Sequence, residues 1–274
     1  MKFQYEKLFS LKGKVAVVTG GAGLLGQNFC RGLAEFGANV VIVDINSNLV
    51  SGLAEELTTE YGVKCIGIEC DITNIESIRR MVTETVKTFG TINILLNNAA
   101  SKADDLEAFF APIEDYSLDE WRKIMAVNID GMFLVAQAVG KQMLTQGEGG
   151  SIIQTSSIYG VVGPDNRIYE GSYYLGREIN TPPVYSASKS AVIGLTRYLA
   201  TMWAEKGIRV NSITPGGVES GQNQEFKMKY SNRIPLRRMA KPEEMVGAIL
   251  YLSSDASSYV TGQNLIIDGG LTAW

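Results

Sequence analysis

The sequence predicts an α/β protein with one doubly wound, parallel sheet of seven strands in a single domain. Three observations support this fold class. Short runs of β-branched residues alternate with longer stretches of helical periodicity along the whole chain. The 274 residues, 45% of them hydrophobic, suit one domain with a full core, with two small domains as the alternative. A glycine-rich turn follows the first strand, as in parallel sheets that bind a ligand at their carboxyl edge.

In the first half of the chain, four strands are expected, each followed by a helix. The strands are short β-branched runs bounded by polar or glycine residues, at Lys14–Thr19, Asn39–Val43, Val63–Glu69 and Ile92–Leu96. The helices follow start signals or show helical periodicity; they are expected at Gly23–Phe36, at Asn48–Tyr61, after the capping box Thr73–Glu76 and after the capping box Ser117–Glu120, the last running to about Gln146.

The second half continues the same alternation. Strands are expected at Ser151–Thr155, Ile208–Ile213 and Asn264–Ile267, and helices from Pro183 to about Lys206 and from Pro242 to Ser253. Because strand–helix–strand crossovers are right-handed, the carboxyl ends of all these strands should meet at one edge of the sheet, where ligands bind. Only the segment Gly160–Pro183 lacks clear periodicity, and a loop of that length is usually functional or mobile.

Composition excludes several classes of function. The net charge of -4 does not support binding to nucleic acid or to an anionic membrane. No apolar run reaches a spanning length and Met1–Ser10 lacks a signal-peptide core, so we expect a cytoplasmic protein. Cys30, Cys65 and Cys70 form no CxxC pair and are expected to be reduced core residues. The chain has no histidine and no cysteine or carboxylate cluster, so no metal site is expected.

The loop Thr19–Gly26 predicts a dinucleotide site of the Rossmann type. Gly21, Gly23 and Gly26 fit the G-x-G-x-x-G pattern between a strand and a helix, where glycines admit a diphosphate to the helix N-terminus. Asp44 ends the second strand, where a carboxylate accepts from ribose hydroxyls and repels a 2′-phosphate. NAD is therefore expected over NADP. The alternative is an ordinary tight turn followed by a surface aspartate.

Two further strand ends face the same edge. Asp71 and Ile72 follow the third strand, and Asp71 could contact an adenine or could cap the next helix. The small residues of Asn97–Ala100 close the fourth strand, where they could let the backbone touch a flat ligand or could only stabilise a turn. The residues alone leave both alternatives open.

Tyr185 and Lys189 are the leading acid–base candidates. They lie four positions apart in a predicted helix, so both side chains share one face. An ammonium beside a phenol favours the phenolate and should lower the pKa of Tyr185 from about 10. Since the chain has no histidine, the usual proton shuttle of neutral pH is missing.

Taken together, these motifs resemble the short-chain dehydrogenase/reductase family over nearly the whole chain. The segments that carry the resemblance are the loop TGGAGLLG, the run NNAA, Ser156-Ser157, YSASK, Pro215-Gly216 and Tyr259–Gln263. The resemblance implies that Tyr185 is the general acid/base and that Lys189 lowers its pKa and holds the nicotinamide ribose. It also implies that Ser157 holds the reacting oxygen and that Asn128 positions a water molecule. Without the family, a strand-end turn serine and a helix asparagine bonded to nearby backbone would be preferred.

The resemblance further implies a cofactor site and an assembly. The cofactor-binding residues would come from five loops and from the Tyr185 helix: Gly20, Gly23, Leu24, Leu25, Gly26, Asp44, Asp71, Ile72, Asn98, Ala99, Tyr185, Lys189, Val218 and Ser220. Leu24 stands where the family usually has glycine, which puts the detailed phosphate contacts in doubt. A homo-oligomer, either a tetramer or a dimer, is expected.

The spacing between Ser157 and Tyr185 departs from the family. The two residues are 28 positions apart (185 − 157), longer than the family's usual spacing, so Gly160–Pro183 is predicted to be an insertion near the active site. It carries aromatic and charged residues that suit a polyhydroxylated or anionic substrate: Arg167, Tyr169, Glu170, Tyr173, Tyr174, Arg177 and Glu178. The alternative is an oligomer contact or a surface lid.

A second segment near the site is predicted to be a substrate lid. It covers residues 221–238, and Arg233, Arg237 and Arg238 in it could meet an anion, although a solvated basic face is the preferred reading. The expected function is NAD-dependent interconversion of a secondary alcohol and a ketone, on a small sugar or sugar-derived substrate. The alternatives are a 3-oxoacyl thioester reductase of the acyl-carrier type and a non-catalytic NAD(H)-binding regulatory protein.

Overall fold

Seven parallel strands form the central sheet of this computed structural model, which describes residues 5–101, 105–174 and 177–274. Their order across the sheet is β3-β2-β1-β4-β5-β8-β9, and all neighbours run parallel. The strands are β1 Val15–Thr19, β2 Asn39–Asp44, β3 Cys65–Glu69, β4 Ile94–Asn97, β5 Gly150–Thr155, β8 Ile208–Pro215 and β9 Asn264–Ile267. The predicted doubly wound fold is confirmed, and every expected strand is present.

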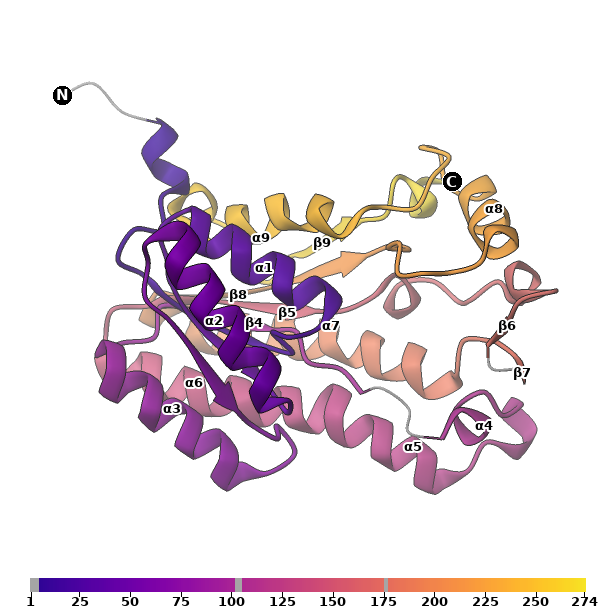
Figure 1. Cartoon of the computed structure of the whole chain (residues 1–274), viewed down its shortest axis with the longest axis horizontal. Helices are drawn as coiled ribbons and strands as arrows, with labels where there is room; N and C mark the ends of the chain where they lie inside the picture. Colours follow the sequence, from indigo (N-terminus) through magenta and orange to yellow (C-terminus); the bar gives the residue numbers. More distant parts are fainter. Residues whose placement is uncertain (1–4, 102–104, 175–176) are drawn as a thin grey trace.

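Helices cover both faces of the sheet (Figure 1). Because strand side chains alternate, Val15 and Val17 pack under one layer of helices, and Ala16 and Val18 pack under the other. The first layer consists of α3 Ile75–Phe89, α6 Met132–Gln146 and α7 Pro183–Trp203. The second layer consists of α1 Leu24–Glu35, α2 Ser47–Tyr61 and α9 Val246–Ser253. The sheet is therefore buried on both sides, and ligands can reach it mainly at its strand ends.

Helix starts follow the predicted capping logic with one correction. Ser117 caps α5, Leu118–Met125, by accepting from the Glu120 amide at 3.1 Å, as expected. The cap of α3 is Asn74 rather than Thr73, because the Asn74 side chain accepts from both the Glu76 and the Ser77 amides. Thr73 instead bonds back to the carboxylate of Asp71.

The long helix Leu118–Gln146 is interrupted by a π-helical turn at Ala126–Gly131. By length and composition this helix could span a membrane, so the expectation that no run of this kind exists is wrong for the described residues. Its apolar side is nevertheless used inside the protein, since Met132, Val135 and Val139 are fully buried against the sheet. We therefore interpret it as a core helix of the domain.

Several short elements were not predicted. They are α4 Leu106–Phe109, α8 Gln224–Asn232 and the antiparallel pair β6 Tyr173–Tyr174 and β7 Arg177–Glu178. The pair β6–β7 lies within the segment that has no sequence periodicity. Residues 175–176 of that segment lie outside the described residues, as do the side chains of Tyr174, Arg177 and Glu178.

Candidate active site

The glycine loop lies at the carboxyl end of β1, next to β4, where strand order reverses. Gly20 has a left-handed backbone with φ of 62°, and a Cβ there would lie 2.8 Å from the Ala99 Cα. A Cβ on Gly26 would lie 2.0 Å from the Gly20 carbonyl oxygen. The loop thus needs glycine at both positions in order to pack against β4 and α1.

The N-terminus of α1 is open, which fits a bound diphosphate. Gly23 is its N-cap and offers no side-chain hydrogen bond, whereas Asn46, Asn74 and Ser117 cap α2, α3 and α5 with their side chains. The first amides of a helix need an acceptor, and the helix dipole favours an anion there. Leu24, which begins α1, is 47% exposed, so the leucine found in place of glycine does not fill the loop.

Asp44 lies beside this loop at the end of β2. One carboxylate oxygen accepts from the Ala22 amide at 3.2 Å and the other from the Asn46 amide at 3.3 Å. The side chain is thereby held next to the glycine loop and is only partly buried. Its position fits the predicted contact with the ribose hydroxyls.

Thr19 joins the loops after β1 and β4, a role that sequence reasoning did not anticipate. Its buried hydroxyl accepts from the amides of Asn98 at 3.0 Å and Ala99 at 3.1 Å. The Asn98 side chain donates in return to the Thr19 and Gly20 carbonyls. The predicted residues Asn98 and Ala99 are therefore fixed against the glycine loop.

The residues after β3 form a turn, and the helix-capping alternative that the sequence left open for Asp71 is not what the structure shows. The Asp71 carboxylate accepts from both the amide and the hydroxyl of Thr73 and does not cap α3. Ile72 is buried, and a Cβ on Gly131 would lie 2.9 Å from its side chain. A contact of Asp71 with adenine remains a prediction.

Ser157, Tyr185 and Lys189 come together at the ends of β5 and α7. Ser157 is buried two residues after the end of β5, and its hydroxyl is close enough to the Tyr185 phenol to lower the pKa of that phenol. The Lys189 ammonium lies 5.9 Å from the centre of the Tyr185 ring. It donates to the Thr155 carbonyl at 3.0 Å, and the Ser156 hydroxyl donates to the Lys189 carbonyl at 2.7 Å. The strand end thus positions both the serine and the lysine.

The pKa of Tyr185 differs from expectation. Burial raises the pKa of Tyr185, the hydrogen bond with Ser157 lowers it, and the neighbouring Tyr169 phenol raises it. The net shift of the Tyr185 pKa is upward, opposite to the lowering expected from Lys189. Burial also disfavours the charged form of Lys189 and lowers the pKa of its ammonium group to about 8.

Lys189 should therefore make stability depend on pH. Its pKa falls from 10.5 in the unfolded chain to about 8 in the 2%-exposed folded site, so the folded state binds fewer protons between these values and stability rises with pH. Relative to Lys189→Met, the wild-type free energy of unfolding should increase by about 2 kcal/mol between pH 7 and pH 9.5. Urea unfolding of both proteins at the two pH values measures this. A constant difference would show that the lysine is not desolvated.

Asn128 lies in the π-helical turn and is 1% exposed. Its side-chain oxygen accepts from the Ser101 amide at 2.8 Å, and its amide donates to the Ser188 hydroxyl at 3.1 Å. Ser188 in turn donates to the Tyr185 carbonyl. Asn128 therefore braces the first turns of α7, and its predicted role in positioning water stays a prediction.

The segment after β8 contributes the last predicted residues. Val218 pairs with Ala240 in an isolated bridge, and the exposed Ser220 bonds to Gln222 through its amide and its hydroxyl. In the predicted lid, Arg233 pairs with Asp165 at 3.4 Å, whereas Arg237 donates to the Asn232 carbonyl. Arg238 pairs with Glu244. The three arginines thus have separate partners and do not converge on one point.

The chain is similar to known proteins both in sequence and in structure. The family model described as enoyl-(acyl carrier protein) reductase matches residues 21–272. The sorbose reductase of Candida albicans is 37% identical over 272 residues, 97% of this chain and 89% of its own length. The structure of a gluconate 5-dehydrogenase from Burkholderia cenocepacia, in complex with NADP and tartrate, has a TM-score of 0.86 at 32% identity and covers 99% of this chain and 100% of its own.

A second solved structure carries the other form of the cofactor. It is a short chain dehydrogenase from Leptospira borgpetersenii with bound NAD⁺, with a TM-score of 0.84 at 33% identity, and it covers 99% of this chain and 97% of its own. The similarity therefore spans the glycine loop, the strand ends and α7 alike.

Proposed function

Because this chain belongs to the short-chain dehydrogenase/reductase family, we propose that it interconverts a secondary alcohol and a ketone, with NAD as cofactor and a sugar or sugar derivative as substrate. Membership of this family makes the chain an enzyme and sets aside the alternative of a non-catalytic binding protein. The single observation that carries the proposal is the meeting of Ser157, Tyr185 and Lys189 at the sheet edge that also holds the open N-terminus of α1.

Each of these side chains has a chemical task. Tyr185 takes the proton from the substrate hydroxyl in oxidation and returns it to the carbonyl oxygen in reduction. Ser157, which lies beside the Tyr185 phenol, donates to the same substrate oxygen and stabilises its developing charge. Lys189 is held by Thr155 on the face of α7 that carries Tyr185, where its charge supports the phenolate and its ammonium can reach a ribose. When bound, the nicotinamide ring supplies the hydride chemistry.

The cofactor would lie along the residues that the glycine loop gathers. Gly20, Gly23 and Gly26 let the glycine loop pack tightly, and the first amides of α1 would face the diphosphate. Asp44 favours NAD, since a 2′-phosphate would meet its carboxylate as a like charge. Asn98, Ala99, Val218 and Ser220 complete the proposed contacts.

A sugar-like substrate is supported by two of the relatives and by the surroundings of Ser157. The relatives that carry sugar or sugar-acid names are the sorbose reductase and the gluconate 5-dehydrogenase. We propose that Gly160–Pro183 is an insertion relative to the family and that it covers the site together with the lid 221–238. Hydroxyl and charged side chains of this insertion suit a polyhydroxylated ligand. We further propose a homo-oligomer in the cytoplasm, without a membrane or nucleic-acid partner.

The second candidate is a 3-oxoacyl thioester reductase, the activity named for a relative from Aquifex aeolicus that is 32% identical over 265 residues. That function needs a basic face for an acidic carrier and is served better by NADPH. The net charge of -4, the carboxylate at Asp44 and the separate partners of the three lid arginines make it the weaker candidate.

A substrate panel distinguishes the two candidates. Polyols, aldonates and sugar phosphates are offered with NAD⁺ while NADH formation is followed, and a 3-oxoacyl thioester is offered with NADPH. We expect at least one polyol or aldonate to have a kcat/KM about a hundredfold above that of the thioester. Turnover of the thioester alone would favour the second candidate.

A further inference from the structure

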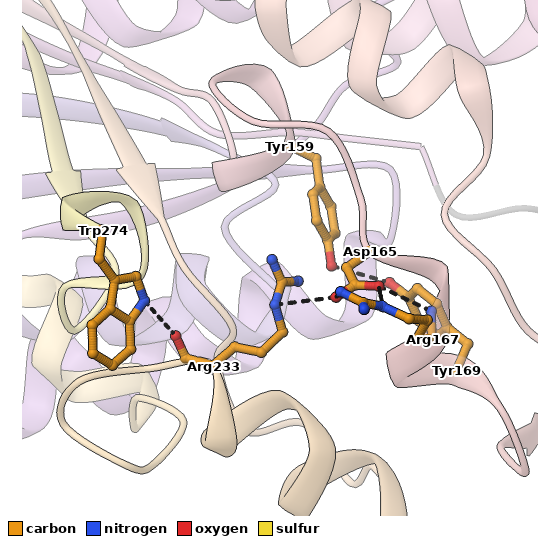
Figure 2. Close-up of polar contacts among 6 residues, drawn as sticks. All are labelled: Tyr159, Asp165, Arg167, Tyr169, Arg233 and Trp274. Carbon is orange, nitrogen blue, oxygen red and sulfur yellow. Dashed lines mark hydrogen bonds and ion pairs between the residues drawn. The ribbon is translucent and has the colours of Figure 1, made fainter.

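Tyr169 fastens the middle of the segment between Ser157 and Tyr185 to both of its ends. Its side chain is 9% exposed, and its hydroxyl lies 2.7 Å from the Thr181 hydroxyl and 3.3 Å from the Tyr159 hydroxyl. Figure 2 shows the Tyr159 and Tyr169 phenols meeting in this way. Tyr159 follows Ser157 by two residues, and Thr181 precedes Tyr185 by four. One phenol hydroxyl therefore connects the stretches that carry the two reacting side chains.

The ring of Tyr169 makes a separate connection, to α8. It packs on Phe226 with ring centres 5.4 Å apart, and Phe226 packs on Tyr230 at 5.6 Å. These rings belong to an apolar cluster that also includes Ile158, next to Ser157, and Leu271 near the C-terminus. Burial of aromatic rings is the main stabilising force available to so short a helix.

An ion pair and a hydrogen bond hold the same two segments together on either side of Tyr169. Asp165 pairs with Arg233 at 3.4 Å and with Arg167 at 2.8 Å, as Figure 2 shows. Lys229 of α8 donates to the Glu170 carbonyl. Tyr169 thus lies at the centre of a contact between the segment and α8 that is polar at its margins and apolar in its middle.

We propose that Tyr169 is a positioning residue: its hydroxyl sets the placement of Ser157 relative to Tyr185, and its ring transmits the position of α8 to that pair. The inference rests on the proposed function, because it assumes that Ser157 and Tyr185 perform the reaction. Tyr169 itself touches neither the reacting oxygen nor the cofactor in this assignment. It acts through Tyr159, which follows Ser157 along the chain, and through Thr181, which precedes Tyr185.

The variant Tyr169→Phe separates the two connections, because it keeps the ring and removes the hydroxyl. Misplacing reacting groups by a fraction of an ångström slows a reaction strongly, so kcat should fall about tenfold to a hundredfold while KM changes less than about threefold. The neighbouring Tyr169 phenol raises the pKa of Tyr185, so removing its hydroxyl should also lower the pH of half-maximal oxidation.

Loss of the contact between the Tyr169 ring and α8 should change the kinetic constants differently from loss of the hydroxyl. Phe226→Leu keeps an apolar side chain but removes the aromatic packing between Tyr169 and α8. We expect KM to rise about fivefold or more, with a smaller change in kcat, because α8 belongs to the proposed lid rather than to the reacting pair. Equal effects of Phe226→Leu and Tyr169→Phe on both constants would overturn the separate roles of ring and hydroxyl.

Controls keep the inference distinct from the proposed function. Tyr259→Phe removes the hydroxyl of a fully exposed tyrosine and should leave all constants unchanged. If Tyr169→Phe does not fold, Thr181→Val removes the neighbouring hydroxyl and should lower kcat in the same way. A Tyr169→Phe protein with only a lower Tm, and with kcat and pH profile equal to those of Tyr259→Phe, would refute the positioning role alone. Full turnover by Tyr185→Phe would refute the proposed function instead.

Discussion

Replacing Tyr185 by phenylalanine should lower kcat by about a hundredfold to ten-thousandfold, the usual contribution of a positioned general acid or base. The change removes one hydroxyl and keeps the ring that packs near Lys189. The chain has no histidine that could take over the proton, and the Lys189 ammonium already donates to the Thr155 carbonyl. NADH titration followed by steady-state kinetics measures the loss, and NADH affinity should change less than about threefold because the cofactor contacts remain.

The matched control lies on the same helix. Tyr198 of α7 is 62% exposed, and Tyr198→Phe removes the same hydroxyl from a side chain outside the site, so it should keep wild-type kcat. A Tyr185→Phe enzyme that turned over as fast as Tyr198→Phe would remove Tyr185 from the mechanism. The reaction would then have to draw its proton transfer from another group.

Cofactor choice should depend on Asp44. We expect NADH to bind the wild type at least about tenfold more tightly than NADPH, equivalent to about 1.4 kcal/mol or more. Asp44→Asn keeps a side-chain oxygen that can accept from the Ala22 amide but removes the negative charge. NADPH affinity should therefore rise about tenfold, whereas NADH affinity should fall slightly as the bond to the ribose hydroxyls weakens.

Net charge must be controlled in this comparison. Glu55→Gln removes a carboxylate from the exposed side of α2, which follows Asp44 in the chain, and should leave the ratio of the two affinities unchanged. Equal binding of NADH and NADPH by the wild type would contradict the role given to Asp44. So would a ratio that does not respond to Asp44→Asn.

The sheet could be predicted because its strands carry their own signal. The runs Val15–Val18 and Val40–Val43 are fully buried and apolar throughout, so the pattern does not depend on the surrounding fold. By contrast, α8 buries only Phe226 and Tyr230, one turn apart. Its helix depends on the apolar cluster beneath it, which the local sequence does not reveal. The two-residue strands β6 and β7 are likewise too short to leave a pattern.

Some features of the candidate site could likewise be predicted from the sequence, and others could not. The glycine loop follows from local sterics, since Gly20 and Gly26 tolerate no Cβ, and a strand before a glycine motif indicates where it lies. The pairing of Tyr185 with Lys189 follows from helix periodicity. The pKa of Tyr185 could not be predicted, because it is set by burial that only the folded protein creates.

The hydroxyl contacts of Tyr169 were also out of reach of sequence reasoning. Tyr159 and Thr181 lie 10 and 12 residues away from it, on either side of a segment without periodicity. Aromatic residues in that segment indicated only that it could matter for a substrate. The structure shows that one of them, Tyr169, is buried against α8 instead of being open to solvent.

A deuterium-transfer experiment tests most directly the central claim that the enzyme moves a hydride between a secondary alcohol and NAD⁺. The best polyol or aldonate of the panel, deuterated at its secondary carbinol carbon, is incubated with wild-type enzyme and NAD⁺. The account predicts that the NADH formed carries the deuterium and that kcat falls about twofold or more relative to the unlabelled substrate if hydride transfer limits the rate. NADH without deuterium, or no NADH from any secondary alcohol of the panel, would contradict the account.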